Sequence, residues 1–167
     1  MQIRKITTNE AEALLVYLKE LVLQDRERVE DINYFNSFSL LDEEKWIEDK
    51  INGEATGEIF VRVADQDGLI TAEGEVEKLK RPIEKHVAEI RFGVLPGNEE
   101  SGEKIVEDLI KTAQDNGIKI LLYFHLSTQK IGIEIVKKLG FELMGEIKDY
   151  YQFSDRAVDR VYYVKYL

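Results

Sequence analysis

The chain has 167 residues, of which 44% are hydrophobic and 34% charged, so we expect one folded domain spanning residues 1–167. It has no cysteine and two histidines, which excludes disulfides, thiolate zinc sites and a cysteine nucleophile, and we expect no metal. The net charge of −10 disfavours nucleic acid and anionic membranes as partners, and without a spanning apolar run or signal core we expect a cytoplasmic protein.

The first elements are expected to be a strand over Gln2–Ile6 and a helix. Asn9 and Glu12 have the spacing of a capping box, in which the first residue caps the helix and the fourth reaches back to it. Leucine and valine recur behind them at helical spacing, so the helix is predicted to run to about Arg28.

A second helix is predicted from Glu43 to about Ile51. Its start is indicated by Asp42 as the cap, with Leu41 and Trp46 placed as the two halves of a hydrophobic staple. Asn52-Gly53 is typical of a helix end, so the helix is expected to stop there.

Three strands follow with short connections. Glu58–Ala64 alternates as a strand, and Asp67-Gly68 predicts a tight hairpin into Leu69–Leu79, which Gly74 is expected to bend or bulge. A third strand is expected over His86–Leu95. Successive strands with short turns predict an antiparallel meander.

The second half alternates helices and strands. Ser101 is the expected cap of a helix closed by Asn116-Gly117, and the apolar run Ile118–Phe124 predicts a buried strand. A helix is expected over residues 131–139, and the last two strands near Phe141–Glu146 and Val158–Leu167. The fold class is therefore α/β, in a mixed α+β arrangement with one central sheet.

Four motifs in this order resemble the GNAT N-acetyltransferase superfamily. They are His86-Val87-Ala88-Glu89-Ile90 with Gly93-Val94 and Pro96, then Ala113–Ile118, Leu139-Gly140-Phe141, and Asp149-Tyr150-Tyr151. The resemblance covers nearly the whole chain. It implies a twisted, mostly antiparallel sheet with splayed fourth and fifth strands, flanked by four helices.

The resemblance also implies acetyl-CoA as co-substrate. Its pantetheine arm would pair with the free backbone of the fourth strand near Phe92, Gly93 and Val94. Its pyrophosphate would lie on the next helix, whose amides and positive end bind anions. Gln129 stands where the family usually has asparagine. The residues expected at the phosphate turn are Asn98, Glu99, Glu100, Ser101, Gly102 and Glu103.

The phosphate turn departs from the family pattern. One register places Gly97, Glu100 and Gly102 on the three pattern positions, and the other places Glu99, Gly102 and Lys104 there. Both leave one matching glycine beside two carboxylates, each of which costs about 1 kcal/mol against a phosphate charge at 4 Å in a water-like dielectric. The alternative reading is a turn that only caps a helix.

The catalytic groups are less clearly marked. Val136 takes the position of the tyrosine that usually protonates the departing thiolate. Glu89 on the fourth strand is the first candidate for the base that removes a proton from the amine, and His125 is the second. His86 faces the other side of a regular strand from Glu89 and is expected to have no catalytic role.

Aromatic residues are candidates for the acceptor pocket. Tyr150 is the third catalytic candidate, with Tyr151 as its alternative, although both also suit packing. Tyr34, Phe35 and Phe38 lie in a segment that walls the acceptor site in many family members, and they equally suit the core.

The function that the resemblance implies is acetyl transfer to a primary amine by direct attack in a ternary complex. The acceptor is expected to be a small-molecule amine, or the N-terminus or a lysine of a protein, and the acidic chain suits a basic acceptor. The alternative is a catalytically weakened CoA-binding or regulatory module. A phosphate-binding hydrolase is a further alternative, but the sequence shows no nucleophile–base pair that would support it. Edge strands also allow a homodimer.

Overall fold

The computed structural model describes residues 1–30, 33 and 37–167. The predicted pocket residues Tyr34 and Phe35 therefore lie outside the described residues. The helices are α1 (Ala11–Gln24), α3 (Leu40–Ala55), α4 (Glu99–Asp115) and α5 (Lys130–Lys138), with a 3-10 turn η1 (Pro82–Glu84). The strands are β1 (Gln2–Arg4), β2 (Ile59–Gln66), β3 (Leu69–Lys78), β4 (Val87–Val94), β5 (Ile120–Leu126), β6 (Glu142–Gln152) and β7 (Ala157–Tyr166).

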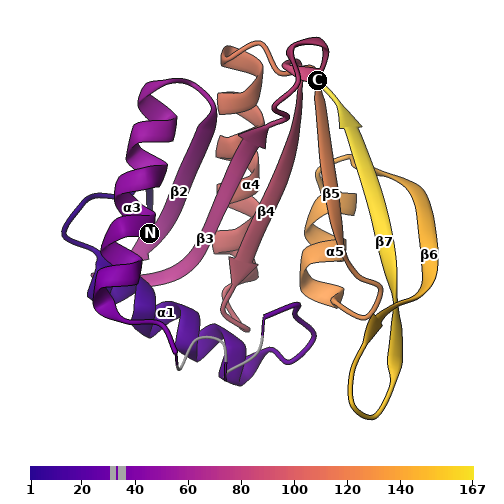
Figure 1. The fold of residues 1–167 in the computed structure, drawn as a ribbon, viewed down its shortest axis with the longest axis horizontal. Helices are drawn as coiled ribbons and strands as arrows, with labels where there is room; N and C mark the ends of the chain where they lie inside the picture. Colours follow the sequence, from indigo (N-terminus) through magenta and orange to yellow (C-terminus); the bar gives the residue numbers. More distant parts are fainter. Residues whose placement is uncertain (31–32, 34–36) are drawn as a thin grey trace.

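The strands form one twisted sheet in the order β1-β2-β3-β4-β5-β7-β6. Every neighbouring pair is antiparallel except β4 and β5, which are parallel and joined through α4. Figure 1 shows β4 and β5 close together at one end and spread apart at the other. The mixed α/β fold with splayed central strands is confirmed.

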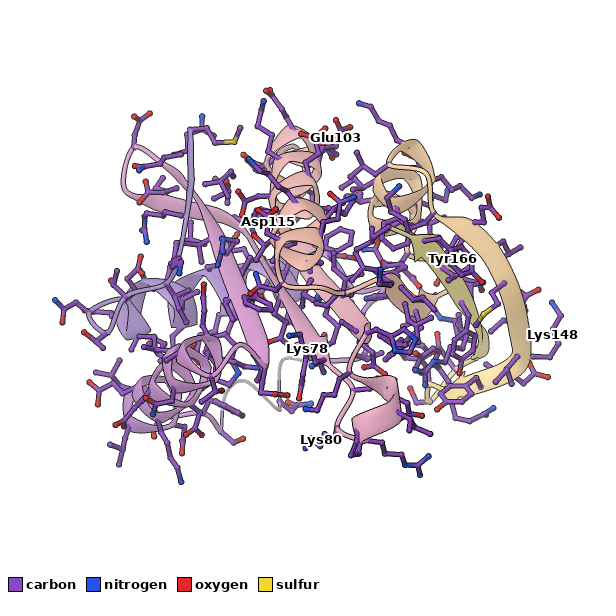
Figure 2. The ribbon with its side chains drawn as sticks, turned by 90° about the horizontal axis from the view of Figure 1, so that it is seen from above. Lys78, Lys80, Glu103, Asp115, Lys148 and Tyr166 are labelled. Atoms are coloured by element: carbon purple, nitrogen blue, oxygen red, sulfur yellow. The ribbon has the colours of Figure 1, made fainter. Side chains whose placement is uncertain are left out.

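Helices cover both faces of the sheet. On one face, α4 and α5 bury a core that includes Ile90, Ile105 and Val136. On the other, α1 and α3 bury a second core that includes Leu14, Ile47 and Val61. Figure 2 looks along the layers, with Glu103 and Asp115 marking α4 on one side of the sheet. Alternate residues of a strand point to opposite faces, so the central strands supply both cores.

The start of α1 differs from the prediction. Asn9 and Glu12 form no capping box, because Glu10 precedes the helix and its carboxylate accepts from the Thr7 backbone N–H at 2.6 Å and also contacts Arg4. The helix also ends at Gln24 rather than near Arg28. The segment after α1 is thereby free to fold across the sheet.

The predicted limits of the second helix were also wrong. Ser39 caps α3, since its Oγ accepts from the Asp42 backbone N–H at 3.2 Å while the Asp42 carboxylate accepts from the Ser39 N–H at 2.9 Å. Asp42 is thus the reciprocal partner rather than the cap. Asn52-Gly53 lies inside the helix, and the chain turns at Gly57, whose φ is +74°.

The antiparallel meander of β2, β3 and β4 is confirmed. Asp67 and Gly68 both have positive φ, as a type I′ hairpin requires. Gly74 makes no bulge: the extra residue of β3 is Thr71, which lies opposite the step from Ala64 to Asp65 in β2. A Cβ at Gly74 would lie 2.8 Å from Ile105 Cγ2, so this glycine lets α4 pack closely on the sheet.

The second half follows the predicted order with shifted limits. Asn98 rather than Ser101 stands at the start of α4, because the Asn98 carbonyl accepts the first helical bond, from the Ser101 N–H at 2.9 Å. β5 begins and ends two residues later than expected, and β6 continues well beyond Glu146 to Gln152. The long β6 pairs with β7 across two register shifts, which sequence alternation does not reveal.

Candidate functional site

The central feature of the site is that β4 has two different ends. Its pairing with β5 is limited to Val87, Ala88 and Glu89, whereas its pairing with β3 continues to Val94. Beyond Glu89, the edge of β4 that faces β5 has no strand partner among the described residues. Unpaired backbone amides and carbonyls of an extended strand are ready to pair with another amide-bearing chain.

A cavity of about 200 Å³ opens where the strands separate. Residues from α1, the segment after it, β3, β4, β5 and β6 line it. Its polar lining includes Arg28, Glu73, Glu75, Arg91, His125 and Tyr151. A concave pocket with a few converging ionisable groups has the character of a small-molecule site.

Glu73 on β3 is the carboxylate at the open end, where it pairs across the sheet with Gly93 of β4. Its Oε1 atom is buried and has no hydrogen-bond partner among the described residues. Burial, followed by the neighbouring charge of Glu75, raises the pKa of Glu73 to about 8. A carboxylate with its pKa near neutral is suited to accept a proton during a reaction.

Glu75 differs from Glu73 because cations surround it. Its two carboxylate oxygens lie 2.5 Å from Lys50 Nζ and 2.8 Å from the Arg91 guanidinium. Arg91 also contacts Glu77, at 2.6 Å. Of the three alternating glutamates of β3, Glu73 is therefore the one without an ion pair in the part of the chain that the structure describes.

Gly93 brings α1 against the open end of β4. A Cβ at this position would lie 2.6 Å from Leu21 Cδ2, 2.8 Å from the Tyr17 hydroxyl and 3.4 Å from Arg28 Nη2. Glycine is therefore needed for the helix and the Arg28 guanidinium to approach the strand. Arg28 itself is largely buried and lies 3.4 Å from Glu30.

The first predicted base, Glu89, lies at the paired end of β4. It is half-buried, sits opposite Glu77, and pairs with Leu122 on its other side. Gly93 lies four positions further along the strand, a distance of about 13 Å. Glu89 is not among the residues that line the cavity.

His125 does line the cavity, at the end of β5. Its Nδ1 accepts from the Leu126 backbone N–H at 2.9 Å, which places the proton of the neutral ring on Nε2. Burial, then the positive charges of Arg28 and Arg160, lower the pKa of His125 to about 3. At neutral pH this ring is a hydrogen-bond donor and a poor proton acceptor.

The two tyrosines of β6 have different places. Tyr150 is 46% exposed, and its hydroxyl accepts from Arg160 at 2.6 Å. Tyr151 packs edge-on against Tyr150 and lines the cavity. Burial raises the pKa of Tyr151. The structure thus brings the alternative tyrosine to the pocket wall and places Tyr150 outside it.

The turn before α4 is the predicted phosphate site. Gly97 has a φ of +86°, and its N–H donates to the Glu99 carboxylate at 3.1 Å. Asn98 folds back onto Leu95, whose carbonyl accepts from the Asn98 N–H at 3.0 Å. Glu99 therefore occupies a backbone amide of the turn that the sequence predicts to bind phosphate.

The other side chains of this turn point in several directions. Glu100 is exposed and lies 3.8 Å from Lys104, whereas Glu103 pairs with Lys138 at 2.6 Å. Ser101 is buried and its hydroxyl accepts from Thr71 at 2.9 Å. Gly102 lets the helix start approach β4, since a Cβ there would lie 2.4 Å from Val94.

Gln129 caps α5 at the far side of the splay. Its Oε1 accepts from the Gly132 N–H at 2.8 Å, and its Nε2 donates to Asp25. Phe92 and Val94 share with Gln129 a narrow crevice that leads from the cavity between the strands. Two of the three predicted pantetheine residues thus meet Gln129 in one place.

The sequence analysis missed Glu73. A usable signal was present, since Glu73, Glu75 and Glu77 alternate along a central strand whose opposite face is apolar. Acids at alternate positions of a central strand face one side of the sheet together. The local pattern does not show that α1 packs beside Glu73.

Neither a metal centre nor a membrane span is found in the part of the chain that the structure describes. No group of three His, Cys, Asp or Glu side chains there is arranged to hold a metal. No helix of that part is long and apolar enough to cross a membrane.

Comparisons with known proteins agree with this geometry. The acetyltransferase (GNAT) domain model matches residues 3–162, while none of the curated sequences matches.

A GNAT-family acetyltransferase structure from Streptococcus pneumoniae superposes with a TM-score of 0.87 at 16% identity, covering 99% of this chain and 98% of that one. Ribosomal-protein-alanine N-acetyltransferase from Brucella melitensis gives 0.82 at 20% identity, with 100% of both chains covered. A putative acetyltransferase from Salmonella typhimurium, solved with its cofactor acetyl-CoA, gives 0.82 at 16% identity, covering 99% and 92%. The chain belongs to the GNAT acetyltransferase family.

Proposed function

We propose that residues 1–167 act as one domain that transfers the acetyl group of acetyl-CoA to a primary amine. The observation that carries the proposal is Glu73, a carboxylate with an unpartnered buried oxygen and a pKa of about 8, opposite Gly93 at the open end of β4. Transfer needs a neutral amine, and a group of this pKa is suited to remove its proton.

Acetyl-CoA fits the open edge. Its pantetheine amides would pair with the backbone over Phe92–Val94, where β5 has moved away. The splay supports this placement because the strand there lacks a partner on one side. The pyrophosphate would reach the amides at the start of α4, where the Glu99 carboxylate must first release the Gly97 N–H.

The reaction is a direct transfer within a ternary complex. The amine nitrogen forms a bond to the acetyl carbon, the carbon–sulfur bond breaks, and the electron pair of that bond leaves with sulfur. The proton from the amine passes to Glu73, directly or through water. No protein nucleophile is required, which agrees with the absence of cysteine.

The acceptor is proposed to be a compact primary amine, either a small molecule or the N-terminus or a lysine side chain of a protein. A cavity of about 200 Å³ takes a group of that size rather than a bulky one. An ammonium group approaching the cavity would be attracted by Glu30, a carboxylate of its lining, and by Glu73 once that side chain has lost its proton.

The test is release of the CoA thiol from acetyl-CoA in the presence of a panel of primary amines. We expect turnover that rises with pH as Glu73 loses its proton, and a kcat about 100-fold lower in Glu73→Gln. The substitution keeps the shape of the side chain and removes its basicity. Full activity of Glu73→Gln across pH 6 to 9 would falsify the assignment.

A second function is favoured by one specific observation. Because the buried Val136 stands where the family usually has the tyrosine that protonates the departing thiolate, the domain would bind CoA as a regulatory module with little catalysis. Measurable CoA affinity without turnover on any amine of the panel would favour this module over the enzyme.

A further inference from the structure

Acetyl transfer also has to release the CoA sulfur, and this chain lacks the usual donor on α5. Val136 stands where that tyrosine would be, and the structure buries it completely between α5 and the sheet. A thiolate leaving group departs faster when a positioned acid protonates it. The question is therefore which hydroxyl reaches the sulfur.

Tyr123 crosses the splay from the β5 side. Its ring stacks on Phe92 of β4 with centroids 5.4 Å apart, and on His125 at 6.2 Å. It lines both the cavity and the narrow crevice between the strands. Its ring therefore lies beside the stretch of β4 along which the pantetheine is proposed to run.

The hydroxyl of Tyr123 reaches the first turn of α5. A Cβ built on Gly132 would lie only 2.3 Å from this oxygen and 3.6 Å from Gln129 Oε1. Glycine at 132 thus makes the space that the hydroxyl occupies. The end of the side chain is fixed at the wall of the crevice, on the opposite side of the splay from Glu73.

Resting on the proposed acetyl transfer, we propose that Tyr123 is the general acid that protonates the departing CoA sulfur. As the carbon–sulfur bond breaks, its electron pair takes the proton from the Tyr123 hydroxyl, leaving a tyrosinate that recovers a proton from water. Glu73 gains the proton of the amine and later releases it to solvent. The two transfers together balance the reaction.

The chemistry of the position agrees with this role. Burial raises the pKa of the Tyr123 hydroxyl above its usual value, so it keeps its proton throughout the neutral range. The hydroxyl therefore remains available as a proton donor beside the sulfur, in a crevice that Arg28, His125 and Gln129 also line.

The test is steady-state kinetics of Tyr123→Phe, with Tyr163→Phe as the matched control. Tyr163 is a neighbouring buried tyrosine on β7, paired with Tyr123 across the sheet, and it does not line the cavity or the crevice. We expect kcat to fall about 10- to 100-fold in Tyr123→Phe, with CoA affinity and melting temperature nearly unchanged. Tyr163→Phe should keep kcat within about 2-fold of wild type, as expected for a hydroxyl that takes no part in the transition state.

A second variant keeps the tyrosine and moves its hydroxyl. In Gly132→Ala the added methyl group collides with this oxygen, while alanine favours the helix by about 1 kcal/mol. We expect a stable protein with a reduced kcat. The role of Tyr123 is overturned if both variants keep the wild-type kcat. It is also overturned if Tyr123→Phe loses as much CoA affinity as rate. Both outcomes leave the proposed function in place. No turnover by the wild type overturns both.

Discussion

The two ends of β4 share one strand, yet they differ in every property that matters for binding. At Val87–Glu89 the strand is hydrogen-bonded on both sides, by β3 and β5. At Ile90–Val94 it is bonded on one side only, and helix α1 lies over Gly93. The paired end is ordinary sheet, and the open end carries the cavity.

The difference shows that the site is made by topology as much as by side chains. Glu89 and Glu73 are both strand glutamates, and local sequence does not separate them. Only Glu73 stands beside the open end, under α1, where burial raises its pKa to about 8. A carboxylate becomes a suitable base through the place that the fold gives it.

The largest expected effect comes from replacing, one at a time, the glutamates near the two ends of β4. Glu73→Gln should lower kcat about 100-fold, because the amine then loses its proton only to water. Glu89→Gln, with the same chemical change about 13 Å away, should lower it less than about 3-fold. The measurement is kcat with saturating acetyl-CoA and amine. A larger loss of kcat in Glu89→Gln than in Glu73→Gln would show that the base is Glu89, at the paired end of β4.

The next prediction concerns Glu43 on α3, a buried acid outside the cavity lining. Burial raises its pKa to about 7 in the folded protein, above its unfolded value, so the folded state resists ionisation. Stability should therefore fall as pH rises from about 4.5 to 7 and stay reduced above that range. Glu43→Gln removes this penalty, and at pH 8 we expect it to stabilise the protein by on the order of 2 kcal/mol.

Urea unfolding at pH 4.5 and pH 8 checks this expectation. The two proteins should differ little at pH 4.5, where Glu43 is protonated in the folded state and about half protonated in the unfolded state. Equal stability at pH 8 would show that Glu43 ionises freely in the folded protein. Since Glu43 also helps to raise the pKa of Glu73, the variant should shift the rate profile to slightly lower pH.

The smallest effect is expected at the phosphate turn. Glu99 accepts from the Gly97 N–H, whereas Glu100 extends into solvent and lies 3.8 Å from Lys104. Glu99→Gln should tighten CoA binding by about 5-fold, because it removes an electrostatic repulsion of about 1 kcal/mol between the carboxylate and the phosphates. Glu100→Gln is the matched control and should change affinity less than about 2-fold because its charge is screened by water. Isothermal titration with CoA separates the two, and equal effects would place both carboxylates in solvent.

The sequence predicted the fold better than it predicted the site. Alternation, the Asp67-Gly68 turn and the helical spacing of apolar residues are local signals, and they predicted the antiparallel meander and the alternating helices and strands of the second half. The start of α1 was misplaced because Glu10, which precedes the helix, is held by Arg4 of β1. The start of α3 was misplaced although its capping box, Ser39 with Asp42, is local. The pocket depends on contacts between distant segments, so the burial of Glu73 under α1 was beyond local reasoning.

The central claim is that acetyl-CoA binds along the open end of β4. Residue-resolved amide hydrogen exchange, with and without acetyl-CoA, compares the two ends within one strand. We predict slower exchange over residues 90–94 when acetyl-CoA is present and little change over Val87–Glu89, which is already bonded on both sides. Unchanged exchange over residues 90–94 at saturating acetyl-CoA would contradict the account.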